Sequence, residues 1–175
     1  MHVEIIAATA DQQPILANLI ELYAYDFSEI SDLRLDANGR FGYTPLPLYW
    51  QETNRYPFLV KVDNNLAGFV LVKKGSAVSG DENVLDIAEF FILRGYRRHG
   101  IGLRVAHEVW RKFPGRWEVR VTERNQAAQA FWSRAVAAFM GIPVEATVIE
   151  ITGKSWPVFS FNTGLAEHYR EGKSE

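Results

Sequence analysis

A basic turn that follows an apolar run is the segment best suited to chemistry. It reads RRHGIG at residues 97–102, directly after the apolar residues 84–93. A strand that breaks into such a turn and then opens a helix points several backbone N–H groups at one place. Gly100 and Gly102 let a ligand approach the main chain closely. The spacing predicts an anion site, and an ordinary turn with solvated arginines stays open as the alternative.

Two common phosphate loops do not fit this turn. A dinucleotide-binding fingerprint requires a third glycine three residues after Gly102, where Val105 stands. A Walker A loop that starts at Gly95 requires Lys and then Ser or Thr, where Ile101 and Gly102 stand. Both of these nucleotide sites are therefore excluded.

An aromatic and acidic segment at residues 23–29 (YAYDFSE) is the second candidate for binding. Tyr25 and Asp26 together could hold a cation, through a ring face and a carboxylate. Packing at the edge of the core is the competing interpretation, because aromatic residues after an amphipathic helix often lie there. We expect Tyr25 and Asp26 to contact the substrate.

Alternating strands and helices must hold these two segments. The patterns of apolar residues predict helices over 13–22, 100–113 and 125–140, with a short helix near 46–52. They predict strands over 3–8, 84–93, 117–122, 144–151 and 158–162, and a hairpin that turns at 63–65. No linker or repeat interrupts this order. We therefore expect one α/β domain over residues 1–175.

The composition excludes several classes of protein. The 175 residues are 47% hydrophobic and 23% charged, which is typical of one globular domain. A net charge of -2 argues against general binding to nucleic acid or to an anionic membrane. The absence of cysteine excludes disulfides and thiolate metal sites, and the four histidines lack a metal-ligand spacing. Without a leader or a long apolar run, the chain is expected to be cytoplasmic and to bind no metal.

The pattern Arg97-x-x-Gly100-x-Gly102 after a strand resembles the pyrophosphate loop of the GNAT superfamily of acyl-CoA-dependent N-acetyltransferases. The elements around it match that family in order and spacing: strand 87–93, helix 102–113, strand 117–122 and the helix headed by Asn125. The resemblance covers about residues 57–141 well. It implies a twisted α+β fold with a mixed, mostly antiparallel sheet of about six or seven strands. Helices flank this sheet, and two central parallel strands are splayed.

By this resemblance, the cofactor is acetyl-CoA, bound as a co-substrate. The backbone amides of five residues would hold its pyrophosphate: Arg98, His99, Gly100, Ile101 and Gly102. Arg97 and Arg98 would add positive charge. The main chain at Ile92 and Leu93 would pair with the pantetheine arm. Asn125 would contact the same arm, and a helix N-cap is an equal and compatible interpretation.

The resemblance implies direct transfer of acetyl to a primary amine of a small molecule, peptide or protein. An amine must lose a proton before it attacks, and Glu89 is the preferred base over Asp86. An ion pair between Glu89 and Arg94 or Arg120 remains the alternative. Trp132 stands where the family often has a tyrosine acid, and core packing is its favoured interpretation.

That replacement keeps a second function open, an acyl-CoA-binding sensor or assembly module with little catalysis. The expected partners are acetyl-CoA and an amine acceptor, without nucleic acid or membrane. Whether the chain forms a homodimer stays open.

Overall fold

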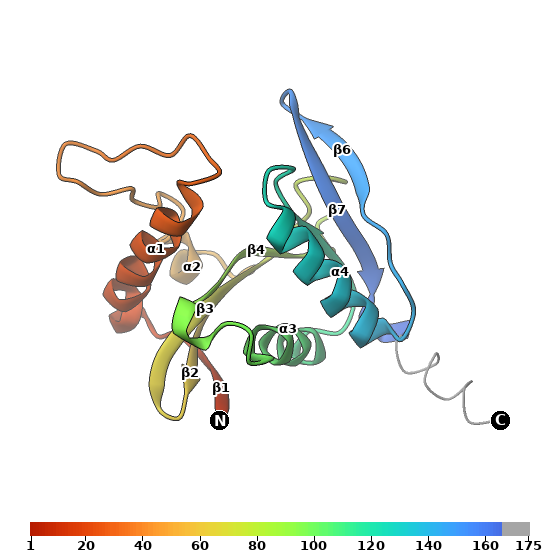
Figure 1. Ribbon diagram of the computed structural model, residues 1–175, viewed down its shortest axis with the longest axis horizontal. Coiled ribbons are helices and arrows are strands. Elements are labelled where there is room, and N and C mark those ends of the chain that lie inside the picture. Colours follow the sequence, from red (N-terminus) through yellow and green to blue (C-terminus); the bar gives the residue numbers. More distant parts are fainter. Residues whose placement is uncertain (166–175) are drawn as a thin grey trace.

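A seven-stranded sheet runs through the computed structural model, which describes residues 1–165 (Figure 1). The strands are β1 (Val3–Ala7), β2 (Arg55–Val62), β3 (Asn65–Lys74), β4 (Leu85–Ile92), β5 (Arg116–Arg120), β6 (Thr147–Ile151) and β7 (Lys154–Asn162). Their order is β1-β2-β3-β4-β5-β7-β6, and every neighbouring pair is antiparallel except β4 and β5. The mixed, mostly antiparallel sheet that we expected is confirmed.

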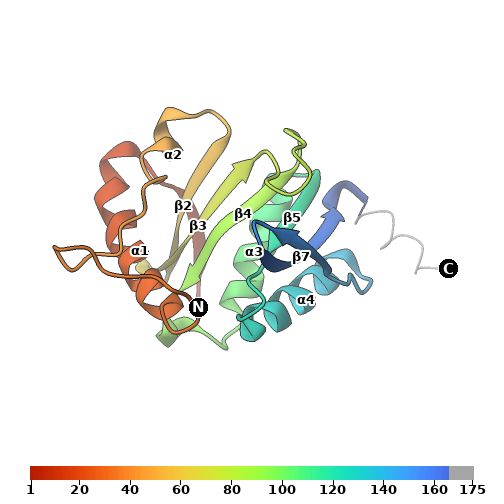
Figure 2. The same cartoon turned by 90° about the horizontal axis from the view of Figure 1, so that it is seen from above.

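Helices cover both faces of the sheet (Figures 1 and 2). One face packs against α1 (Gln13–Phe27) and α2 (Leu48–Gln51), and the other packs against α3 (Ile101–Lys112) and α4 (Gln126–Met140). Apolar residues at helical spacing explain this packing, since Val105, Val109 and Trp110 of α3 are all 0% exposed. Each helix pair therefore buries one apolar face against its own side of the sheet.

The two central parallel strands pair over a short distance only. Leu85 lies opposite Trp117 and Asp86 lies opposite Glu118, and no further pair joins β4 to β5. β4 nevertheless continues to Ile92. The strands therefore separate beyond Asp86, as a splayed pair requires, and leave an unpaired edge on β4.

A β-bulge in β4 sets the face on which its last residues lie. Val72 of β3 pairs with Ile87 and Leu71 pairs with Glu89, so Ala88 is the extra residue. Leu71 belongs to the apolar cluster under α1, whereas Val72 belongs to the cluster under α3 and α4. The bulge therefore places Glu89 on the face that α1 covers.

Three predicted boundaries were wrong. α1 continues past residue 22 to Phe27, because Ala24 is buried and the rings of Tyr23 and Phe27 lie 5.7 Å apart on the same side. β7 starts at Lys154 instead of residue 158, because the residues between Ile151 and Lys154 form a tight hairpin turn. β6 starts at Thr147 instead of residue 144.

Candidate active site

A cavity of about 970 Å³ opens where β4 and β5 separate. It extends from the last turn of α1, past the end of β4 and the first turn of α3, and along one side of α4. Its wall includes Asp26, residues 90–92, Gly100, Gly102 and Asn125. The cavity therefore brings the basic turn and the aromatic, acidic segment into one site.

The basic turn presents a row of unused backbone donors to this cavity. Gly100 caps α3 with a φ of 75°, and Arg98 has a φ of 65°, so the chain bends through the left-handed region twice. Within residues 1–165, the amides of residues 98–103 donate no hydrogen bond. Consecutive free N–H groups at the start of a helix bind phosphate oxygens. The turn therefore fits a pyrophosphate.

Gly102 and three aromatic residues form the apolar wall next to these amides. A Cβ at Gly102 would lie 3.3 Å from the ring of Phe131. The rings of Phe90 and Trp132 lie 5.0 Å apart, edge to face, and Trp132 is 6% exposed. Trp132 is thus a packing residue of this wall, and indole N–H is not a practical acid.

Asn125 caps α4 at the cavity wall. Its Oδ1 accepts a hydrogen bond from the Ala128 amide at 3.0 Å. The cap that we expected is present. Because Asn125 also lines the cavity, capping does not prevent contact with a ligand.

Two arginines of the turn are bound to α1. Arg97 pairs with Asp26, and its Nε donates to the carbonyl oxygen of Ile92 at 2.7 Å. Arg94 Nη2 lies 2.7 Å from Asp26 Oδ1. Burial acts to raise the pKa of Asp26, but the bonds from Arg97 and Arg94 prevail and lower this pKa. Asp26 is therefore an ionised anchor for both guanidinium groups.

Glu89 lies under α1, behind the cavity wall. Its side chain interacts with the hydroxyl groups of Tyr23 and Tyr43. Burial raises the pKa of Glu89, although these hydroxyl groups act in the opposite direction. Within residues 1–165 Glu89 forms no ion pair, because Arg94 pairs with Asp26 and Arg120 pairs with Asp86. Tyr23 lines the cavity and connects it to Glu89.

Most of the predicted site residues lie around this one cavity. The predicted residues that line it are Asp26, Ile92, Arg97, Arg98, Gly100, Gly102 and Asn125. Those that do not line it are Tyr25, Glu89, Leu93, His99 and Ile101. Tyr25 is 69% exposed and Ile101 is 3% exposed. Tyr25 therefore faces away from the cavity, whereas His99 and Ile101 stand in the row of free amides between the lining residues Arg98, Gly100 and Gly102.

Several residues of the wall were not predicted as site residues, among them Arg124 and Arg134. Tyr23 and Phe27 also line the cavity; they lie in the segment 23–29 that was expected to bind, and in the helix that was predicted to stop too early. Arg124 lies just before α4, and Arg134 lies in the third turn of α4. Neither arginine forms an ion pair within residues 1–165. Charged residues on the same side of the helix as Phe131 were the available signal.

In residues 1–165, no three His, Asp or Glu side chains gather closely enough to hold a metal ion. No helix there has the length and the apolar run needed to cross a membrane.

The fold is that of known acetyltransferases. An acetyltransferase from Thermus thermophilus aligns with a TM-score of 0.68 at 16% identity, over 93% of this chain and 97% of that one. The aminoglycoside acetyltransferase AAC(6')-Ib, solved with coenzyme A, aligns with a TM-score of 0.71 at 12% identity, over 97% and 99%. The PaiA N-acetyltransferase from Thermoplasma acidophilum, also solved with coenzyme A, gives 0.61 at 13% identity, over 93% and 99%.

The sequence itself defines the family. The model of the acetyltransferase (GNAT) family matches residues 19–136, which is more than half of the chain. The protein belongs to the GNAT acetyltransferase family. No curated protein matches the sequence.

Proposed function

We propose that the protein transfers the acetyl group of acetyl-CoA directly to a primary amine. The observation that carries this proposal is the row of free amides at residues 98–103, beside the unpaired edge of β4. When bound, acetyl-CoA supplies an activated thioester. The amides of Arg98 to Gly102 hold the pyrophosphate, and the main chain at Ile92 pairs with the pantetheine arm. Leu93, which was also expected to pair, is already used: its amide donates to the Ala67 carbonyl and its carbonyl accepts from the Tyr96 amide.

Glu89 is the proposed base. An acceptor amine is protonated near neutral pH and must lose a proton before its nitrogen can form the new N–C bond. The raised pKa of Glu89 suits this role. Because Glu89 stands behind the wall, the proton reaches it through the Tyr23 hydroxyl or a water molecule. The C–S bond breaks as the N–C bond forms, and the thiolate leaves.

The rival function is a binding module that holds acyl-CoA without turnover. The packing of Trp132 favours this rival, because no tyrosine stands there to protonate the leaving thiolate. Release of free thiol from acetyl-CoA in the presence of amines separates the two. Tight binding without thiol release above the hydrolysis blank would establish the rival.

Glu89→Gln is the sharper test of catalysis. We expect turnover to fall by about 100- to 10,000-fold, because a positioned base is lost, while the affinity for coenzyme A stays the same. In the wild type, turnover should decline as the pH falls through the raised pKa of Glu89, because the protonated acid cannot accept a proton. The exposed pair Glu108 and Arg104 on α3 supplies the control Glu108→Gln. Unchanged turnover in Glu89→Gln would remove this role.

A further inference from the structure

The end of the cavity beside α1 carries an apolar wall. The ring of Tyr23 lies 5.7 Å from that of Phe27 and 5.9 Å from that of Phe91. Ile30 lines the same end. An acceptor held here therefore meets rings and an aliphatic side chain along one side.

The charges at this end are balanced. Two acids, Asp26 and Glu29, and two arginines, Arg94 and Arg97, line it. Asp26 is bonded to both arginines, whereas Glu29 forms no ion pair within residues 1–165. Each guanidinium group carries five N–H donors, more than one shared carboxylate accepts. This end therefore keeps both a free carboxylate and spare N–H donors.

This balance distinguishes between classes of amine. A polyamine or another polycation needs a surplus of free carboxylates, and among residues 1–165 this end offers only Glu29. A zwitterion carries one charge of each sign, and both of its charges find a partner here. The apolar wall adds space for a hydrocarbon or aromatic side chain.

We propose that the acceptor is an α-amino acid, or a close zwitterionic analogue, with an apolar side chain. This inference rests on the acetyl transfer proposed above. The acceptor carboxylate binds the outward N–H groups of Arg94, which Asp26 holds in place. The side chain lies against Tyr23, Phe27 and Phe91. The amine forms the N–C bond with the acetyl carbon, its proton passes to Glu89, and the thiolate is released.

The first test needs only the wild-type protein. Thiol release is followed with pairs that differ only in the carboxylate: L-phenylalanine against 2-phenylethylamine, and L-leucine against 3-methylbutylamine. We expect kcat/KM to be about 10- to 100-fold higher for each amino acid, the range for one hydrogen-bonded charge contact. We expect spermidine to rank below the amino acids. Equal values within the pairs, or a preference for spermidine, overturn the inference.

The second test assigns the preference to Arg94. Arg94→Ala should bring the ratio of kcat/KM values within each pair close to one, and Arg94→Lys should restore part of the ratio because it keeps the charge. Arg104→Ala is the control, because Arg104 pairs with Glu108 on α3 and does not line the cavity. An unchanged ratio in a folded Arg94→Ala variant overturns the inference.

The two proposals fail in different ways. If coenzyme A binds but no amine or amino acid releases thiol, acetyl transfer itself is wrong, and the inference about the acceptor falls with it. If decarboxylated amines or spermidine are the better substrates, acetyl transfer stands and only the zwitterionic acceptor is wrong.

Discussion

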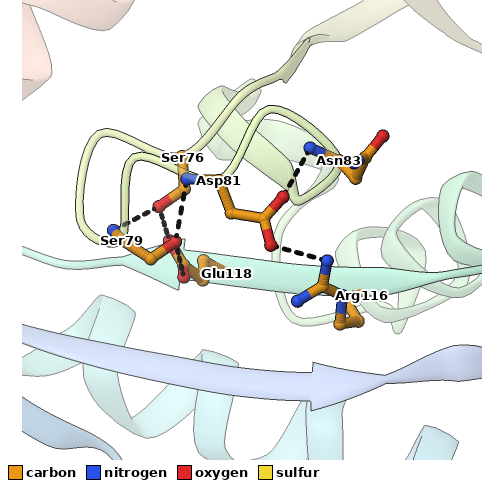
Figure 3. Close-up of polar contacts among 6 residues, drawn as sticks. All are labelled: Ser76, Ser79, Asp81, Asn83, Arg116 and Glu118. Carbon is orange, nitrogen blue, oxygen red and sulfur yellow. Dashed lines mark hydrogen bonds and ion pairs between the residues drawn. The ribbon is translucent and has the colours of Figure 1, made fainter.

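The two ends of the β4 and β5 pair are built in opposite ways. At the paired end, the loop after β3 is fastened to β5 (Figure 3). The hydroxyl groups of Ser76 and Ser79 donate to the carboxylate of Glu118, and Asp81 lies 2.6 Å from Arg116. At the splayed end, the amides of residues 98–103 have no acceptor in residues 1–165. Polar groups are bonded to one another at the paired end, whereas the amides at the splayed end have no partner among residues 1–165.

This contrast separates stability from binding. Glu118 is 8% exposed, so its bonds replace water that it lost on folding. The free amides at the other end lie at a cavity that is open to solvent, where an amide needs no protein acceptor, and we propose that a ligand binds there. We therefore expect substitutions at the paired end to change the free energy of unfolding, and substitutions at the splayed end to change ligand affinity.

The largest effect is expected at the splayed end, from Gly100→Val. A branched side chain at a φ of 75° is strained and stands where, in our proposal, the phosphate meets the main chain. Loss of about two charge-assisted hydrogen bonds should weaken coenzyme A binding by about 100-fold. Isothermal titration calorimetry measures this change, and circular dichroism checks that the variant is folded.

Gly153→Val is the matched control for strain. Gly153 has a φ of 73° in the turn between β6 and β7, and a Cβ there meets nothing within 4 Å, as at Gly100. It should show a similar loss of stability with normal affinity for coenzyme A. If Gly100→Val binds coenzyme A normally, the amides of the turn do not hold the pyrophosphate.

A smaller effect is expected at the paired end, from Ser76→Ala. This change removes a donor from the buried Glu118 carboxylate and the acceptor of the Val78 and Ser79 amides. We expect a loss of about 1–3 kcal/mol in the free energy of unfolding, the usual cost of an unsatisfied buried group. Urea denaturation measures this loss, and coenzyme A affinity should not change.

A second hydrogen bond from a serine to a glutamate lies in an exposed place and serves as the control. Ser155 donates to Glu150 on the hairpin of β6 and β7, where both residues are reached by solvent. Ser155→Ala should therefore cost less than about 0.5 kcal/mol, because water replaces the lost bond. Equal losses in the two serine variants would mean that burial does not distinguish the two pairs.

The site could be predicted where it depends on local backbone. The bend of the turn and its free amides follow from glycine positions and a helix start within a few residues, whereas anion binding there stays a prediction. The splayed strands came with the family resemblance. The choice between Tyr23 and Tyr25 depended on a helix end. Side chains two positions apart in a helix, such as those of Tyr23 and Tyr25, point about 200° apart. If the helix stops at residue 22, the sequence does not say in which direction either tyrosine points. Because the helix reaches Phe27, Tyr23 points toward the cavity and Tyr25 points away from it.

Contacts between distant segments could not be predicted. Asp26 and Arg97 are 71 residues apart, and no spacing within either segment announces their pairing. The bulge at Ala88 likewise depends on the register between β3 and β4. From the sequence we therefore expected Asp26 to be a free carboxylate for a cation. In the structure, Asp26 is paired with Arg94 and Arg97.

The smallest effect is a difference in pH dependence between two aspartates near the paired end. Burial raises the pKa of Asp86, although Arg120 acts against this. Hydrogen bonding from the Asn83 amide, and then from Arg116, lowers the pKa of Asp81, which is partly exposed. Folded protein therefore binds a proton at Asp86 more tightly than unfolded chain does, and binds one at Asp81 less tightly.

The stability changes should therefore have opposite signs. Ionisation of Asp86 costs stability as the pH rises above the ordinary pKa of aspartate. The free energy of unfolding of Asp86→Asn should therefore increase relative to that of the wild type from about pH 3 to pH 7. Asp81 stabilises the fold above the ordinary value, and this contribution is lost as the pH falls through its lowered pKa. The free energy of unfolding of Asp81→Asn should thus decrease relative to that of the wild type over the same rise in pH. Urea denaturation across this range measures both differences, and slopes of the same sign would contradict the contrast between a buried and a solvated carboxylate.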